Sequence, residues 1–155
     1  MSLEKVKQHL SQWNRESDII LLNQSSATVH QAAEALGVSV AKIAKSISLY
    51  DKDNGVIVIV ASGQSKIDSK KFKERFDFKA KMLSFEDVEV LVGHPVGGVC
   101  PFGVNDGVKV FLDLSLKHFN YVYPACGTVN SAIKLTIPEL EKYSLSEEWV
   151  DVTKD

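Results

Sequence analysis

The apolar residues of this chain follow helical spacing in some segments and strand alternation in others. In residues 2–16 they recur three or four positions apart, which predicts an amphipathic helix. Residues 46–50 alternate between polar and apolar, and residues 56–61 are apolar throughout and β-branched at nearly every position. Residues 51–55 contain Asn-Gly, which tolerates positive φ at both central positions of a tight turn. We therefore expect a hairpin whose second strand is buried on both faces at the centre of a sheet.

Capping residues and glycines mark the helix ends. Thr28 with Gln31 three positions later predicts a capping box, and Gly37 is expected to end that helix. Residues 38–45 read as another short helix, with Lys45 at its end where a strand begins. Further helices are predicted over 69–76, 84–91 (capped by Ser84 with Asp87) and 137–143, and strands over 19–22, 80–83, 108–113, 121–124 and within 128–137, with a turn or short helix at 114–118.

This order of elements favours an α+β fold. Strands paired by hairpins and interrupted by helices predict a mixed, largely antiparallel sheet rather than a doubly wound parallel one. A chain of 155 residues with 45% hydrophobic and 25% charged residues fits one domain over residues 1–155.

Charge and cysteine content narrow the classes of function. The net charge of −2 excludes the global basic field that sequence-independent nucleic-acid binding requires. Residues 66–81 are locally rich in lysine and arginine, which fits either a solvated helix face or a phosphate contact. Two cysteines are too few for a disulfide framework, and no apolar run is long enough for a signal peptide or a membrane span. We expect a cytoplasmic protein.

Residues 92–103 are the strongest candidate for a site. They contain four glycines, two prolines, His94 and Cys100 between two apolar runs. Such a segment predicts a rigid loop with exposed amides, which can bind an anion or a developing oxyanion, although a tight structural connection would also use glycines. The spacing matches neither the dinucleotide fingerprint nor the P-loop, so a nucleotide cofactor loses its best support.

The sequence leaves three side-chain chemistries to be weighed: a zinc site, a cysteine nucleophile and a lysine that binds an anion. His30, His94, Cys100 and Cys126 lack the paired spacing of a zinc site. Cys100 as a nucleophile would need a base within reach, and a cysteine packed as a small apolar residue is more common. Lys45 is either a surface lysine near a helix C-terminus or a cation that holds a phosphate or carboxylate.

Several motifs together resemble the YbaK/EbsC family of trans-editing aminoacyl-tRNA deacylases, which are related to the editing domain of bacterial prolyl-tRNA synthetases. The match runs nearly from end to end. The specific part is the Gly-x-x-x-Pro-Phe-Gly loop that begins at Gly97, together with the upstream Lys45. The supporting segments are residues 28–38, 43–47, 61–63 with Asp68, 110–116, and Gly127.

The resemblance implies a barrel-like mixed sheet and hydrolysis of the ester that joins a wrong amino acid to the tRNA 3′ end. In the family, the lysine matching Lys45 holds the substrate near its terminal adenosine, and the glycine matching Gly97 lies against the scissile carbonyl. We expect Lys45 and the amides of Gly97 and Gly98 to be catalytic. No metal, cofactor or protein nucleophile is implied, and water is activated by the substrate's own hydroxyl or thiol. The expected substrate-binding residues are His30, Ser46, Ser62, Gly63, His94, Val99, Pro101, Phe102 and Gly103.

Specificity is left open by the resemblance. Ser46 stands where the family often has another polar residue, the role of His94 stays open, and alanyl, cysteinyl and seryl groups are all candidate substrates. The expected partner is a mischarged tRNA, with an aminoacyl-tRNA synthetase kept open as a second. The alternatives are a non-catalytic module that binds a tRNA end, a nucleotide or a small anion through the same loop, and a cysteine hydrolase.

Overall fold

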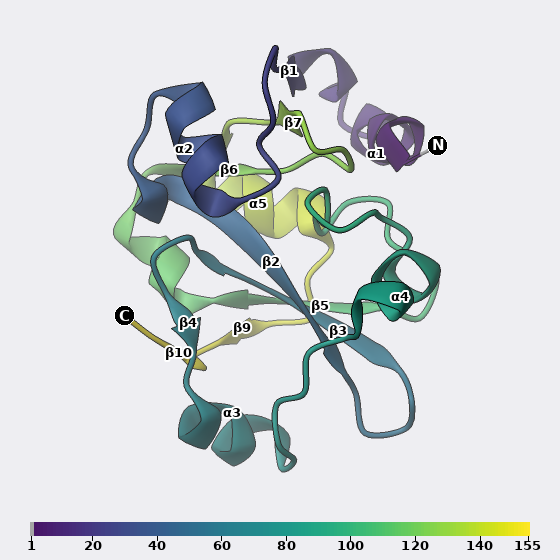
Figure 1. Ribbon diagram of the computed structural model, residues 1–155, viewed down its shortest axis with the longest axis vertical. Coiled ribbons are helices and arrows are strands. Elements are labelled where there is room, and N and C mark those ends of the chain that lie inside the picture. Colours follow the sequence, from purple (N-terminus) through teal and green to yellow (C-terminus); the bar gives the residue numbers. More distant parts are fainter. Residues whose placement is uncertain (1) are drawn as a thin grey trace.

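The computed structural model describes residues 2–155, which form a curled mixed sheet surrounded by helices (Figure 1). The strands of this sheet are β2 Ile43–Tyr50, β3 Val56–Ser62, β5 Lys109–Asp113, β6 Tyr121–Pro124, β8 Leu135–Thr136 and β9 Trp149–Val150. Their order in the sheet is β8-β6-β2-β3-β5-β9. Within residues 2–155, β2–β3 and β6–β8 are antiparallel, whereas β2–β6, β3–β5 and β5–β9 are parallel. The α+β fold with a mixed sheet is confirmed, with a larger parallel share than the hairpin pattern predicts.

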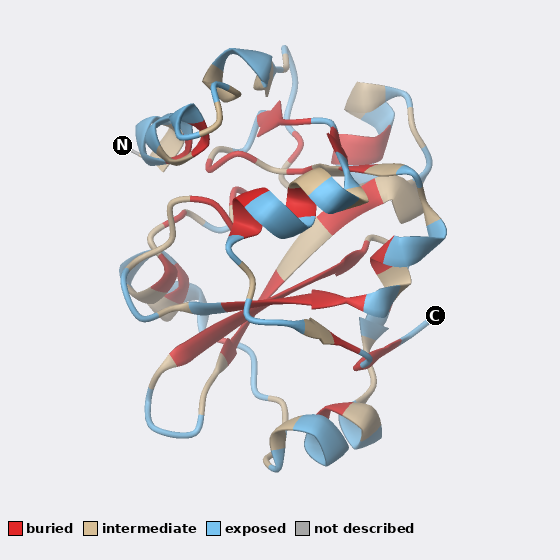
Figure 2. Cartoon of the chain, turned by 180° about the vertical axis from the view of Figure 1, so that it is seen from behind, coloured by how far each residue is buried: buried red, intermediate tan, exposed pale blue. Residues whose placement is uncertain are grey.

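The β2–β3 hairpin forms the middle of this sheet, as predicted. Every residue of β3 is buried, because apolar clusters pack on both faces of the sheet (Figure 2). The Asp51 N–H donates to the Gly55 carbonyl at 2.9 Å, so three residues form the loop. Asn54 alone of the Asn-Gly pair has positive φ, at 63°. The turn is therefore one residue longer than the Asn-Gly motif predicts.

Most predicted helices are present. They are α1 Ser2–Ser11, α2 Val29–Leu36, α3 Ser69–Phe76, α4 Phe85–Asp87 with a π-helical continuation over Val88–Val92, and α5 Ile137–Ser144, with a 3-10 turn over Leu114–His118. The Thr28–Gln31 capping box is formed, and Gly37 takes φ 69° at the end of α2. α1 is shorter than predicted because Asn14 adopts a left-handed conformation. Ser84 caps α4, but Asp87 accepts from the Tyr50 hydroxyl instead of closing a capping box.

Two predictions around β2 are corrected by the structure. In residues 38–45 only Val40–Lys42 form a 3-10 turn, so Lys45 is the third residue of a strand and not the end of a helix. Residues 80–83 contribute a single bridge, Met82 to Leu49, rather than a strand.

Short strands that pair with distant parts of the chain complete the fold. β1 Ile20–Leu21 pairs with β7 Ser131–Ala132, and β4 Lys66–Ile67 pairs with β10 Thr153–Lys154. The sequence pattern did not indicate β4, β9 or β10, since each has only two residues. None of the helices in residues 2–155 has the length and apolar character needed to cross a membrane.

Candidate active site

A cavity of about 600 Å³ lies along the edge of β2 that faces away from β3. β6 pairs with this edge only at Ile43 and Ala44, and the next contact is the bridge between Leu49 and Met82. The residues between these two contacts, 45–48, line the cavity. A gap in strand pairing therefore creates the site and exposes the β2 backbone to it.

The remaining walls come from five segments that are far apart in the sequence, and they are mostly apolar. They are the beginning of α2, the segment leading into the π-helical turn, the glycine-rich loop over residues 92–103, the chain around β6 and β7, and β4. Their residues are Ser26, Ala27, Thr28, Val29 and Ala32; Met82, Leu83 and Val88; Val96, Gly97 and Val99; and Tyr123, Ala125, Ser131 and Ala132, with Lys66 and Ile67 from β4.

Lys45 places a cation in this cavity. Its side chain is half-buried and its Nζ donates to the backbone carbonyl of Ser65. Burial lowers the pKa of the Lys45 ammonium from its ordinary value of 10.5. Within residues 2–155 no ion pair joins Lys45 to a carboxylate. The ammonium is therefore available to an anionic or carbonyl group of a ligand.

Ser46 supplies polar groups beside this cation. Its Oγ is buried and has no hydrogen-bond partner among residues 2–155. The Ser48 carbonyl and the Tyr50 N–H point toward residues 81–83, to which they are hydrogen-bonded. Because backbone direction alternates along a strand, the N–H and carbonyl of Ser46 point to the same edge. A ligand in the cavity can thus meet a donor, an acceptor and a hydroxyl at one residue.

Gly97 also lines the cavity. It has φ +90°, which favours glycine, and a Cβ there would lie 2.9 Å from the Ala27 Cβ. No hydrogen bond within residues 2–155 occupies its N–H. This amide can therefore bind a ligand oxygen.

Gly98 does not share that role. Its N–H donates to the Pro95 carbonyl at 2.9 Å and is therefore already used inside the loop. A Cβ at Gly98 would lie 2.7 Å from the carbonyl carbon of Gly127. The expectation of a free Gly98 amide is wrong, because the Pro95 carbonyl accepts its hydrogen bond. The lack of a side chain at Gly98 instead allows close packing on the backbone of residues 127–128.

His94 and Cys100 do lie together, but both are fully buried outside the cavity. The Cys100 Sγ is 3.6 Å from the His94 Nε2, which itself lies 2.6 Å from the Phe102 carbonyl oxygen. Since that oxygen only accepts, Nε2 carries the proton and cannot act as a base toward the thiol. Burial raises the pKa of the Cys100 thiol to about 12, so it stays protonated near neutral pH. This geometry contradicts both the cysteine hydrolase and a substrate-binding role for His94.

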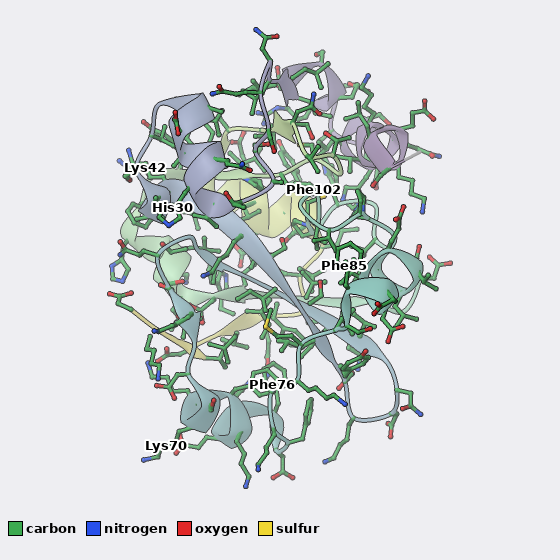
Figure 3. The ribbon with its side chains drawn as sticks, in the orientation of Figure 1. His30, Lys42, Lys70, Phe76, Phe85 and Phe102 are labelled. Carbon is green, nitrogen blue, oxygen red and sulfur yellow. The ribbon has the colours of Figure 1, made fainter. Side chains whose placement is uncertain are left out.

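The other predicted binding residues divide into three groups. Ser46 and Val99 line the cavity, whereas His30 is exposed on α2 and is not part of its lining (Figure 3). The rest are structural: the Ser62 Oγ donates to the Ala41 carbonyl, Gly63 packs on the Val40 carbonyl, Pro101 is buried, Phe102 belongs to the core, and the Gly103 N–H donates to His9. None of these five residues is part of the cavity lining, so their expected contact with substrate is corrected.

Most of the cavity wall could not be predicted from the sequence. Small apolar residues such as Ala27, Ala32 and Ala125 carry no signal that separates a cavity wall from a core. Of the basic side chains in residues 66–81, Lys66 alone lines the cavity, while Lys70 on α3 lies at the end of the molecule opposite α2 (Figure 3). Within residues 2–155 no three His, Cys, Asp or Glu side chains are grouped as metal ligands would be.

Known proteins are similar to this chain in sequence and in fold. Residues 23–143 match the aminoacyl-tRNA editing domain family. The chain is 54% identical over 155 residues to the uncharacterized protein YwhH of Bacillus subtilis, covering 100% of this chain and 99% of that protein. It is 24% identical over 132 residues to EbsC of Enterococcus faecalis, a protein named as a candidate Cys-tRNA(Pro)/Cys-tRNA(Cys) deacylase, covering 84% and 80% of the two chains.

A solved structure extends the likeness to three dimensions. The crystal structure described as a candidate trans-editing enzyme for prolyl-tRNA synthetase has a TM-score of 0.87 and 26% identity, covering 99% of this chain and 98% of that one. These matches support a deacylase-type function at a coarse level. The chain belongs to the aminoacyl-tRNA editing domain family, in its YbaK/EbsC group.

Proposed function

We propose that this protein hydrolyses, in trans, the ester bond between a wrong amino acid and the 3′ end of a tRNA. The observation that carries the proposal is the Lys45 ammonium, which has no carboxylate partner within residues 2–155 and lines the same cavity as the unoccupied Gly97 N–H. The names of two matched proteins, one described as a candidate Cys-tRNA deacylase and the other as a candidate trans-editing enzyme, support the substrate class. We further propose that residues 1–155 act as one editing domain in the cytoplasm, where an aminoacyl-tRNA synthetase is a second partner.

In the proposed complex, the cavity holds the aminoacyl group and the terminal adenosine. Lys45 donates to an oxygen of the ribose or phosphate near this adenosine. The Ser46 carbonyl and Oγ accept from the α-ammonium of the amino acid. The apolar wall around Ala27, Ala32 and Val99 excludes bulk water and limits the side chain that fits.

The proposed reaction needs a polarised carbonyl and a positioned water. The Gly97 N–H donates to the carbonyl oxygen of the ester and stabilises the negative charge that forms on this oxygen when water attacks the carbonyl carbon. A hydroxyl or thiol of the substrate accepts the proton of that water. The tetrahedral intermediate then expels the ribose oxygen, which takes up the proton that the substrate group accepted from the water, so that free amino acid and uncharged tRNA are released.

A panel of mischarged tRNAs tests this function. We expect the purified protein to release amino acid from at least one of them, and Lys45→Met to lower kcat/KM about 100-fold, since a charge-assisted hydrogen bond contributes about 1.5–3 kcal/mol. Lys42→Met is the matched control. Lys42 lies over the Tyr121 ring at 4.7 Å and does not line the cavity, so its loss should leave the rate unchanged.

Two outcomes would contradict the proposal. Binding of aminoacyl-tRNA that depends on Lys45 but is never followed by hydrolysis would indicate a non-catalytic binding module. A full rate in Lys45→Met would remove this lysine from the mechanism.

A further inference from the structure

The side chain of Lys45 is held by a segment that lies outside the strands of the central sheet. Its Nζ donates to the carbonyl of Ser65, a residue only 1% exposed. Ser65 closes a turn in which its N–H donates to the Ser62 carbonyl at 3.0 Å. β4 begins at the next residue, Lys66. The position of the carbonyl that orients Lys45 therefore depends on where β4 lies.

β4 is fixed by the last residues of the chain. It pairs with β10 through Thr153–Ile67 and Lys154–Lys66, and the two strands lie side by side in Figure 1. The Asp68 N–H donates to the Val152 carbonyl at 2.8 Å. A two-residue strand pair is too short to be stable alone, so β4 and β10 need an anchor elsewhere.

That anchor is Asp113 at the end of β5. Its carboxylate is fully buried and accepts from the Val152 N–H at 2.9 Å, the Thr153 hydroxyl at 2.7 Å and the Ser115 N–H at 2.9 Å. No ion pair with a cation within residues 2–155 accounts for its burial. The three hydrogen bonds are what compensate a buried charge of this kind, and two of them go to β10 and the residue before it.

We propose that Asp113 and Thr153 are positioning residues for Lys45, acting through β10, β4 and the Ser65 carbonyl. The proposal rests on the proposed deacylase function for its catalytic meaning, but the geometry of Lys45 is independent of that function. Val152 and Thr153 lie outside residues 23–143, the part that matches the editing-domain family. The C-terminal strand thus belongs to the active site without touching the substrate cavity.

Thr153→Val is the test, because it removes one hydroxyl at nearly constant volume. When the hydroxyl no longer holds Asp113, β10 and β4 loosen and the Ser65 carbonyl no longer orients the ammonium. We expect kcat for deacylation to fall about tenfold with a smaller change in KM, since binding of the rest of the tRNA is untouched. Thr153→Ser keeps the hydroxyl and is the matched control, with an expected kcat equal to that of the unmodified protein.

The pKa of Lys45, measured by NMR titration of its 13Cε, is a second readout that an overall loss of stability would not change. The hydrogen bond to the Ser65 carbonyl favours the charged form of Lys45. Loss of this hydrogen bond should therefore lower the pKa of Lys45 further in Thr153→Val and not in Thr153→Ser. Charged groups along this path include Lys66, which lines the same cavity, and Asp155, which accepts from the Ser65 Oγ. Lys71 lies on the path as well, since its Nζ donates to the Thr153 carbonyl at 3.0 Å. All three are present in both variants, so they do not cause the difference.

The outcomes separate this inference from the proposed function. If Thr153→Val folds and has unchanged kcat and an unchanged Lys45 titration, the inference is overturned. If the unmodified protein hydrolyses no mischarged tRNA, the proposed function fails, and the titration alone decides whether the C-terminal strand positions Lys45. Should Thr153→Val not fold, Asp113→Asn weakens the same bond, and the same two results decide the question.

Discussion

At the scale of single residues, the buried Ser46 hydroxyl lacks a hydrogen-bond partner within residues 2–155, which lowers stability but leaves the hydroxyl available to a ligand. A buried hydroxyl without a partner costs about 1–3 kcal/mol relative to a satisfied one. Such a group persists where a ligand completes its hydrogen bonding, and Ser46 lies beside Lys45 in the cavity wall.

The variant Ser46→Ala should therefore separate stability from activity. We expect the free energy of unfolding to stay equal or rise by up to about 1 kcal/mol, because an unsatisfied polar group is removed. KM for the aminoacyl-tRNA should rise several-fold, because the substrate loses an acceptor. Chemical denaturation and steady-state kinetics measure the two effects.

Ser62→Ala is the control for this variant. The Ser62 Oγ donates to the Ala41 carbonyl at 2.7 Å outside the cavity, so this change should destabilise the protein and leave KM unaltered. A Ser46→Ala protein that is less stable and equally active would contradict a ligand-binding role for Ser46.

At the scale of elements, two helices with the same N-terminal capping motif differ in whether they line the cavity. Thr28 caps α2 and Thr136 caps α5, each with a complete capping box. The first turn of α2 lines the cavity through Thr28 and Val29, whereas no residue of α5 does.

Removing each cap should therefore cost similar stability but unequal activity. Thr28→Ala and Thr136→Ala should each lower the free energy of unfolding by about 1 kcal/mol. Only Thr28→Ala should lower kcat/KM, because the frayed turn of α2 moves the cavity wall. Equal loss of activity in both variants would show that α2 has no special role in the site.

The sequence predicted such helices well because their signals are local. Thr28, Gln31 and Gly37 define α2 within ten residues, and α3 begins and ends where the spacing predicts. β4, β9 and β10 could not be predicted, because a two-residue strand is defined only by a partner far away in the chain. Lys45 was wrongly placed at a helix end for the same reason, since its strand is decided by β3.

At the scale of the whole molecule, His94 links folding to pH. It is fully buried between the Ser2 hydroxyl and the Phe102 carbonyl. Burial lowers the pKa of His94 below its ordinary value of 6.5. As the pH falls below about 6.5, the unfolded chain binds a proton that folded His94 does not bind, so stability is lost toward acid and is fully present above that pH.

The free energy of unfolding should accordingly decrease below pH 6.5 with a contribution from His94 of at most roughly 1.4 kcal/mol per pH unit. Denaturation curves between pH 5 and pH 8 measure this slope. His94→Gln should reduce it, even if that variant is less stable at every pH. An unchanged slope in the variant would show that His94 is not the group responsible.

The order of amino acids was enough to predict most of the helices, the central hairpin, the family, and two residues that line the cavity, Lys45 and Gly97. Each depends on local periodicity or on an unusual residue type, which the order of amino acids records directly. Tertiary structure alone decided which residues reach the cavity. It assigned the Gly98 amide to Pro95, placed Cys100 and His94 inside the core, and opened the cavity beside Ser46. The reason is physical: whether an amide, a thiol or an ammonium is free depends on burial and hydrogen-bond partners, and distant segments of the chain supply both.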